Sequence, residues 1–318
     1  MGDPAGIGPE LVVRALAARP GLNVRVFGDA DILTATARGI GLPAPAAACV
    51  QPVPPGGSTD IVAGRPTLAS ARAQLDYLQA ATDAALAGEI SALCTAPISK
   101  EWIARAGFAF PGHTEYLADR AGTVDFAMML AGPRLRVVLA TRHIALRDVA
   151  VALNAGEIVR AAVLAARALV TQFGVGRARV AVAGLNPHAG ESGRFGDEEG
   201  RVVVPAIQQA RARLEGEGVP AVVSGPYPPD AVFRQAVLGE FDAVVALYHD
   251  QGLIPLKLLH FDEAVNITLG LPFPRTSPDH GTAYDIAGTG RANAGSFLAA
   301  LDLAVRLGAR SRVSGNRV

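Results

Sequence analysis

The sequence predicts a three-layer α/β protein of two domains. Short apolar runs typical of buried strands alternate with amphipathic helical segments along the chain. The 318 residues exceed one typical domain. Half of them are hydrophobic and only 18% are charged, which is ample for a core and far from the composition of disordered chains.

Charge and cysteine content narrow the possible partners. The 29 basic residues match 29 acidic ones, so no overall field favours nucleic acid or an anionic membrane, and any anion binding must be local. Cys49 and Cys94 form neither a metal spacing nor a disulfide framework, which fits a reducing cytoplasm. No apolar run reaches membrane-spanning length.

Helix signals are clear in the first part of the chain. Pro9 can start a helix over ELVVRALAAR. NVRVFG predicts a short strand, residues 29–39 predict a helix, and the Pro- and Gly-rich residues 42–62 predict a loop. Thr67 is expected to cap a long amphipathic helix that continues to Ala87.

Polar residues then begin to follow strand ends. ISALCTAPISK predicts an apolar strand ending in polar residues up to Lys100, and WIARAG predicts a short helix. FPGHTEYLADRAG places His113 and Thr114 before a helix whose first turn contains Glu115. A phosphate seat at this helix N-terminus and a simple Thr cap explain the pattern equally well.

The middle of the chain repeats the scheme. FAMMLAG and LRVVLATRH predict a β-hairpin with His143 just past its second strand, and a helix is expected over residues 155–173. ARVAVAG predicts a strand, followed by a loop with Asn186 and His188 and then by a helix over residues 202–214.

Further strands follow in the last third. After the strand PAVVSG, Asp230 is expected to cap a helix. An apolar strand over residues 243–247 ends at His249 and Asp250, and a second strand, AVNITLGL, contains Asn266. In open α/β sheets ligands lie at the carboxyl ends of the strands, so these polar residues are candidates for a site.

Two cations and an asparagine close to strand ends suggest a local anion site. Lys257 and Arg275 accompany Asn266, and Arg275 is expected to precede a Pro/Gly-rich loop. Considered alone, His249 is also explained as a hydrogen-bonded core histidine, and Lys257 as a surface lysine. A last amphipathic helix is expected over residues 294–307.

Three histidines follow three separate strand ends: His143, His188 and His249. This arrangement suits three imidazole ligands for a divalent metal that keeps positions open for substrate. The separations along the chain are too long for a self-evident zinc motif, so unrelated histidines explain the pattern as well. His260 is expected on the surface.

Eight sequence blocks occur in a fixed order from Gly2 to Ala283: GDPAGIGPE, TAPISK, GHTEYLA, LNPHAGE with a trailing FG and EE, GPYPPDAVF, YHDQGL, VNITLGLPF and RTSPDHGTA. Together they resemble the 4-hydroxythreonine-4-phosphate dehydrogenase family of pyridoxal phosphate synthesis. Members usually carry a short apolar strand before the first block, so we expect either a truncated start or a sheet with one strand fewer.

The resemblance implies roles for particular residues. It implies a metal held by His143, His188 and His249, with the ligands shared between the subunits of a homodimer. Candidate catalytic residues are Asp230, Asp250 and Lys257, the two aspartates either orienting a metal-bound histidine or transferring a proton. The residues that match the family's substrate contacts are His113, Thr114, Lys257, Asn266 and Arg275.

The segment HGTAYDIAGTGRAN is similar to the nucleotide-binding loop of isopropylmalate and isocitrate dehydrogenases, whose fold the family shares. The similarity implies NAD or NADP bound without a Rossmann fingerprint. The nearest Gly-x-Gly, at Gly174 and Gly176, precedes its strand, whereas a Rossmann loop follows one. Candidate cofactor contacts are Asn186, His280, Gly281, Thr282, Ala283, Asp285 and Asn293.

The resemblance also implies a domain plan and a reaction. Residues 1–118 with 263–318 should form one domain and residues 119–262 a second domain with dimer contacts, with the active site in the interdomain cleft at the dimer interface. The implied reaction is metal-dependent oxidation of 4-phosphooxy-L-threonine by NAD(P), followed by decarboxylation to 3-amino-2-oxopropyl phosphate, in the cytoplasm. Zinc is the expected metal, with magnesium or cobalt as alternatives.

Two other readings stay open. A related dehydrogenase could act on a phosphorylated four-carbon sugar acid or on a terephthalate dihydrodiol, with a carboxylate in place of the phosphate. A non-redox protein resembling phosphate acetyltransferases is the other possibility. Three histidines at strand ends argue against this last class, because it needs no metal.

Overall fold

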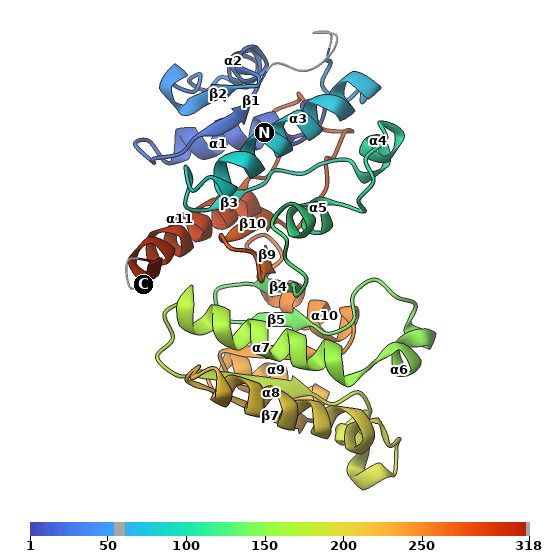
Figure 1. Ribbon diagram of the computed structural model, residues 1–318. Helices are drawn as coiled ribbons and strands as arrows, with labels where there is room; N and C mark the ends of the chain where they lie inside the picture. Colours follow the sequence, from blue (N-terminus) through green and yellow to red (C-terminus); the bar gives the residue numbers. More distant parts are fainter. Residues whose placement is uncertain (54–60, 316–318) are drawn as a thin grey trace. The chain divides into compact units, whose positions relative to one another are not determined.

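The computed structural model describes residues 1–53 and 61–315, with side chains as far as residue 310, and divides the chain into two compact units (Figure 1). Unit 1 comprises Met1–Gly122 and Arg275–Val305, and unit 2 comprises Thr123–Pro274 and the chain from Arg306 onward. These divisions differ from the predicted boundaries at residues 118 and 262. Strand β9 (Val265–Leu269), predicted in the first domain, lies in unit 2.

Unit 1 is built from two parallel strand pairs and the helices around them. Strand β1 (Val26–Gly28) pairs with β2 (Val50–Pro52), and β3 (Leu93–Cys94) pairs with β10 (Arg275–Pro278). The helices are α1 (Gly8–Ala18), α2 (Ala30–Gly39), α3 (Leu68–Leu86), α4 (Lys100–Arg105), α5 (His113–Arg120) and α11 (Gly295–Gly315) as far as Val305.

Local capping signals were good predictors of helix starts in unit 1. The Asp29 side chain accepts the first N–H groups of α2, and Thr67 forms a reciprocal capping box with Ser70 at the start of α3. Two strands differ from the expectation. β2, with the short 3₁₀ turn Ala47–Cys49 before it, lies inside the predicted loop, whose residues 54–60 are outside the described part. Arg275 begins the short strand β10, which was not predicted and which leads into the expected loop.

The described strands of unit 2 form one sheet in the order β9-β4-β5-β8-β6-β7. β4 runs antiparallel to both neighbours, and β5, β8, β6 and β7 are mutually parallel. The strands are β4 (Ala127–Ala131), β5 (Arg136–Leu139), β6 (Ala178–Ala183), β7 (Ala221–Tyr227), β8 (Ala243–Ala246) and β9. The antiparallel pairing of β4 with β5 confirms the predicted hairpin.

Five whole α-helices, the end of α11 from Arg306 to Gly315 and three tighter or wider turns complete the described part of unit 2. The helices are α6 (Val149–Ala152), α7 (Ala155–Thr171), α8 (Val204–Gly216), α9 (Pro229–Val237) and α10 (His249–His260). The turns are the 3₁₀ segments η2 (Leu146–Asp148) and η3 (Pro187–Gly193) and the π-helical turn η4 (Glu199–Val203). Pro228 is the N-cap of α9, so Asp230 does not cap this helix as predicted.

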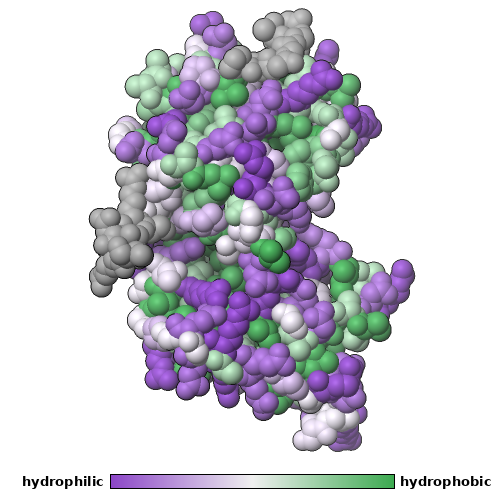
Figure 2. Space-filling view, in the orientation of Figure 1, coloured by the Kyte–Doolittle hydropathy of each residue, from purple (hydrophilic) through white to green (hydrophobic). Residues whose placement is uncertain are grey.

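Several large apolar side chains of unit 2 are exposed. Figure 2 shows apolar side chains gathered where α6 lies in Figure 1, and Leu146 and Val151 there are 72% and 90% exposed. Helix α10 exposes Ile254, Leu258 and Phe261, which follow one another at helical spacing along one face and its end. An exposed apolar stripe of this kind is typical of an interaction surface.

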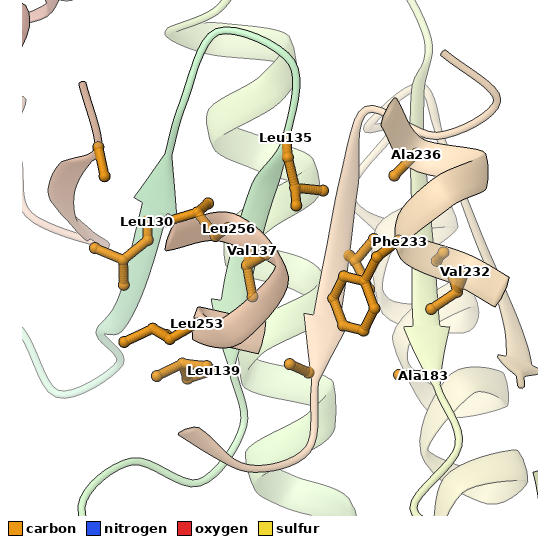
Figure 3. Close-up of a cluster of buried hydrophobic side chains, with 14 residues drawn as sticks. Leu130, Leu135, Val137, Leu139, Ala183, Val232, Phe233, Ala236, Leu253 and Leu256 are labelled. Atoms are coloured by element: carbon orange, nitrogen blue, oxygen red, sulfur yellow. The ribbon is translucent and has the colours of Figure 1, made fainter. Parts of the chain in front are cut away.

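Helices cover both faces of the unit 2 sheet, as the three-layer prediction requires. On one face, α9 places Phe233 and α10 places Leu253 and Leu256 against the side chains of the strands (Figure 3). Val137 and Leu139 of β5 lie beneath α10 in this view. Helix α7 crosses the other face, in contact with β4 to β8, and α8 packs beside α7.

Helix α10 was not predicted, because its sequence contains Gly252 and Pro255. Gly252 lets the helix approach the sheet: a Cβ there would lie 2.4 Å from the Val137 side chain. His260, the last residue of α10, is only 4% exposed, and the prediction that it lies on the surface was wrong. Its ring occupies the space above Gly132, where a Cβ would come within 2.3 Å of it.

No single helix in the described ranges is long and apolar enough to cross a membrane. Leu146–Ala152 and Ala155–Thr171 reach the required length and composition only when taken together, and they are bent by 92°. Most of α7 is buried against the unit 2 sheet, as expected for a core helix.

Candidate active site

Three neighbouring parallel strands bring the three predicted metal ligands to one edge of the unit 2 sheet. Strands β5, β8 and β6 lie side by side in that order. His143 follows β5, His249 opens the helix after β8, and His188 lies in the loop after β6. The carboxyl ends of parallel strands meet at one edge, which is where ligands bind in open α/β sheets.

Hydrogen bonds tie these three strand ends together. The buried Gln251 accepts the Leu247 N–H at 2.7 Å and donates to the Gly184 carbonyl at 2.7 Å, which joins the ends of β8 and β6. The Thr141 hydroxyl donates to the Leu247 carbonyl at 2.6 Å and joins the end of β5 to that of β8. Sequence reasoning missed Gln251, and its only signal was its place in YHDQGL directly after a strand.

His143 and His249 lie next to each other within one chain. Their ring centroids are 5.4 Å apart and the rings are inclined by 44°. Two imidazoles bound to one tetrahedral zinc, at Zn–N distances of about 2.0 to 2.1 Å, have centroids about 5 Å apart, so the spacing fits a shared ion. Asp250 Oδ1 lies 2.7 Å from His249 Nδ1, which leaves Nε2 as the ligating nitrogen.

His188 is not part of a ready-made three-residue site. The described residues include no group of three His, Cys, Asp or Glu side chains placed to hold a metal ion. The His188 ring packs edge-on against Phe195, with centroids 6.1 Å apart. The structure therefore supplies two of the predicted ligands together and holds the third on a separate loop.

The loop that carries His188 has an unusual backbone. Residues 188–192 all have positive φ, and four of them, His188, Ala189, Glu191 and Ser192, are not glycine. Left-handed backbone costs about 1 to 2 kcal/mol for each such L-residue, and it rarely occurs in consecutive residues. Strain of this kind persists where the surrounding structure imposes it, often at functional sites.

A pocket of about 260 Å³ opens beside the paired histidines. Polar and apolar side chains share its walls, as in small-molecule sites. The lining residues are Arg142, His143, Ile144, Leu146, Val149, Tyr248, His249 and Asp250.

The remaining predicted residues of unit 2 are spread over three elements. Lys257 is half-buried on α10, with Nζ 6.0 Å from the centre of the Phe261 ring. Asn266 is on β9, and its buried Oδ1 accepts no hydrogen bond from the part of the chain that the structure describes. Asp230 is exposed in the first turn of α9. Of the two predicted aspartates, Asp250 is the one in contact with a histidine.

In unit 1, Arg275 and His113 form a second group of predicted residues. The Arg275 side chain is 3% exposed and donates to the Thr95 hydroxyl at 2.7 Å. Burial lowers the pKa of Arg275 to about 10, so it stays protonated at neutral pH. Burial, with the nearby charges of Arg275 and Lys100, holds the pKa of His113 well below its usual value.

The start of α5 joins this group. His113 is the first residue of the helix and Thr114 the second, and Gly112 is the N-cap with no side-chain capping bond. The predicted alternative of a simple Thr cap is therefore wrong. A guanidinium, a neutral imidazole and a hydroxyl at a helix N-terminus are compatible with an anionic substrate group.

The predicted cofactor loop is held by two buried acids that sequence reasoning missed. Asp3 accepts the Tyr284 hydroxyl, the Gln74 amide at 2.9 Å and the Ala5 N–H at 2.8 Å, and burial raises its pKa. Glu10 accepts the N–H groups of Gly288 and Gly290 at 2.7 and 3.3 Å. In the sequence, the only sign of these roles was the presence of two acidic residues in an otherwise apolar, glycine-rich first block.

Most predicted cofactor contacts lie on this one loop. The Ile7 N–H donates to the Thr282 carbonyl at 2.9 Å, which joins the loop to the first block. Asn186 stands apart from them, in unit 2, where its amide donates to Glu198 and Glu199. The residues on the loop are His280, Gly281, Thr282, Ala283, Asp285 and Asn293.

Comparison with known proteins decides the family. The model of the family described as pyridoxal phosphate biosynthetic protein PdxA matches residues 22–304. The chain belongs to the PdxA family. The resemblance drawn from the eight sequence blocks is thereby confirmed, and so is the α/β fold.

PdxA relatives match the chain over nearly its full length. A 4-hydroxythreonine-4-phosphate dehydrogenase from Desulfosudis oleivorans is 49% identical over 96% of this chain and 94% of its own. The crystal structure of the Klebsiella pneumoniae 4-hydroxythreonine-4-phosphate dehydrogenase is 43% identical, with TM-score 0.86 over 97% of this chain and 98% of that one. A terephthalate 1,2-cis-dihydrodiol dehydrogenase from Burkholderia xenovorans is 33% identical, with TM-score 0.69 over 96% of each chain.

Proposed function

We propose that this PdxA-family protein oxidises 4-phosphooxy-L-threonine with NAD or NADP. The product, 2-amino-3-oxo-4-phosphooxybutanoate, then decarboxylates to 3-amino-2-oxopropyl phosphate in pyridoxal phosphate biosynthesis. The observation that carries the proposal is the pairing of His143 and His249, with ring centroids 5.4 Å apart, at strand ends of a chain that belongs to this family.

His143 and His249 fit a divalent metal, with His188 as the third ligand. Such an ion would lower the pKa of the substrate alcohol and stabilise the negative charge that develops during oxidation and decarboxylation. Zinc suits imidazole nitrogens best among the expected metals, with magnesium or cobalt as alternatives. Asp250 would hold the tautomer of His249 through Nδ1.

The chain's own residues supply the rest of the reaction. A bound nicotinamide would supply the hydride acceptor, and the hydroxyl proton of the substrate would pass to a base, for which Lys257, Asp250 and Asp230 are the candidates. Arg275, His113 and Thr114 would bind the phosphate, with Arg275 as the fixed charge. Lys257 and Asn266 are the substrate contacts proposed from unit 2.

The loop over residues 280–293 would bind the nucleotide. Asp3 holds its Tyr284 side chain and Glu10 holds its backbone, so its exposed groups, including those of His280 and Asp285, are presented in one arrangement. Asn186 is the proposed contact from unit 2. NAD and NADP are both compatible with these residues.

We further propose a cytoplasmic homodimer whose subunits share the metal ligands. Support comes from exposed apolar side chains on α10 and beside the pocket. Leu258, at 84% exposed, lies on the helix that His249 begins, and Leu146 lines the pocket beside both rings. Covering such a surface by a second copy would bury it without any further partner.

The direct test is reduction of NAD+ or NADP+ by the purified protein with each candidate substrate. Turnover should be highest with 4-phosphooxy-L-threonine, should be lost after exhaustive chelation and should return with a divalent ion. Faster turnover of a phosphorylated four-carbon sugar acid or a terephthalate dihydrodiol would identify a different substrate for the same kind of oxidation. No reduction with any of them would favour the non-redox reading.

A further inference from the structure

The trailing acidic pair of the LNPHAGE block includes a glutamate with a defined set of contacts. Glu199 is 6% exposed. Its Oε1 accepts the backbone N–H groups of Leu185 and Asn186, both at 2.8 Å, and its Oε2 accepts the Asn186 amide at 3.0 Å. One buried carboxylate thus accepts three hydrogen bonds, which fix the first residues of the loop after β6.

The loop folds around this carboxylate. A Cβ on Gly190 would lie 2.7 Å from Glu199 Oε2, and a Cβ on Gly184 would lie 3.2 Å from Oε1. Gly190 also has a φ of 79°, a conformation that suits glycine. The Glu199 side chain therefore fills the interior of the turn that contains His188.

The backbone conformation of the turn is one that most of its own residues disfavour. Its non-glycine residues have φ between 43° and 59°, which L-residues avoid. The Ala189 N–H donates to the Asn186 carbonyl at 3.1 Å and starts the turn at the residue that Glu199 holds. At the end of the turn, the Arg194 N–H donates to the Glu191 carbonyl at 3.3 Å and the Phe195 N–H to the Gly190 carbonyl at 3.2 Å. Without the carboxylate, residues 188–192 would relax toward ordinary backbone angles, and the His188 ring would move with them.

We propose that Glu199 is a positioning residue for His188, which holds the strained turn ready for metal binding before any metal arrives. The inference rests on the proposed function, because His188 must be a ligand for its position to matter. Groups that hold a metal ligand in place affect the affinity of the site without touching the metal.

The test uses Glu199→Gln in the full-length protein. A glutamine has one acceptor oxygen and an NH₂ group, so it cannot accept the two N–H groups and the amide together. In the metal-free protein, hydrogen exchange of a peptide covering residues 184–196 should become faster. Cobalt affinity, measured by optical titration, should fall roughly 10- to 100-fold, with a weaker visible band.

Glu198→Gln is the matched control. Glu198 neighbours Glu199, is half-buried and accepts the same Asn186 amide, at 2.7 Å. It carries the same charge but lies outside the turn's interior, so both readouts should change less. Equal exchange and equal cobalt affinity in the two variants would overturn the proposal.

The two readouts separate this proposal from the proposed function. If the wild type binds no cobalt, metal ligation fails, and faster exchange in Glu199→Gln alone still decides whether the carboxylate anchors the turn. If Glu199→Gln does not fold, Gly190→Ala tests the same contact, because its methyl group displaces Glu199 Oε2. Unchanged exchange and cobalt affinity in Gly190→Ala would then contradict the proposal.

Discussion

Arg275 of unit 1 and the three histidines of unit 2 are held in opposite ways. In unit 1, Arg275 and the acids that hold the cofactor loop are buried and hydrogen-bonded within their own unit. In unit 2, His143 and His188 are exposed and His249 is half-buried beside an open pocket. The position of a buried group is fixed by the fold of one chain, whereas that of an exposed metal ligand depends on the partner chain or the metal ion that binds it. Substitutions in unit 1 should therefore act through side-chain geometry, and substitutions of the unit 2 histidines should act through the partner chain.

The largest expected effect tests whether the unit 2 histidines need a second chain. His188→Ala and His249→Ala homodimers should each be inactive, because every site lacks a ligand. When the two are co-refolded, random mixing makes half the dimers hetero, and each has one intact site of two. About a quarter of wild-type activity should return if the ligands are shared. Subunit exchange, measured with differently tagged chains, is the required control.

The other two mixtures identify which ligand crosses the interface. The sequence resemblance implies His143 and His188 from one subunit and the partner subunit's His249. That arrangement restores activity to His143→Ala mixed with His249→Ala. The pairing of His143 with His249 in one chain instead favours recovery of His143→Ala mixed with His188→Ala. No recovery in any mixture would show that all three histidines of a site come from the same chain.

The second prediction concerns geometry in unit 1. Arg275→Lys keeps the charge but loses the forked donors and the bond to Thr95. Substrate affinity should fall by roughly 1 to 3 kcal/mol, with NAD+ binding little changed, as measured by calorimetry.

Lys257→Arg is the matched exchange at a half-buried position of unit 2. It should cost less affinity, because an open position tolerates a different cation. If Arg275→Lys abolished NAD+ binding and left substrate affinity intact, Arg275 would belong to the cofactor site. A larger loss for Lys257→Arg would reverse the contrast between the units.

The smallest expected effect is a pH dependence set by burial. The pKa of His113 is lowered in the folded protein, first by burial and then by Arg275 and Lys100. Its contribution to stability is therefore complete above the unfolded value of about 6.5 and is lost as the pH falls toward the folded value. Between pH 7 and pH 5 this loss is at most about 2 kcal/mol.

Urea unfolding at both pH values checks this. His113→Gln should lose less stability on acidification than the wild type, and His280→Gln, at an exposed histidine of the same unit, should match the wild type. Identical pH dependence in all three proteins would show that His113 contributes nothing to it.

Features encoded locally could be predicted from the sequence, and those set by distant contacts could not. Apolar runs located most of the strands, although not β2 or β10. Asp29 and Thr67 marked helix starts, because a cap acts within one turn. Helix α10 was missed because a glycine and a proline give its sequence a low helix propensity. Packing against β5 overrides that propensity in the folded protein.

The candidate site shows the same division. The histidines were found because each directly follows a strand. The roles of Asp3 and Glu10 were missed because their partners lie about 280 residues away, at Tyr284 and Gly288. The burial of His260 depends on a space above Gly132, which no local pattern reveals.

The chain path has a consequence for synthesis. Unit 1 needs strand β10 and the start of α11, but the ribosome makes Thr123–Pro274 first. At roughly 5 to 20 residues per second, these roughly 150 residues take on the order of 8 to 30 s. For that time the first 122 residues lack the strand that pairs with β3 and the loop that Asp3 and Glu10 hold. During translation, Thr123–Pro274 is therefore expected to fold before unit 1 is complete, although Met1–Gly122 precedes it in the chain.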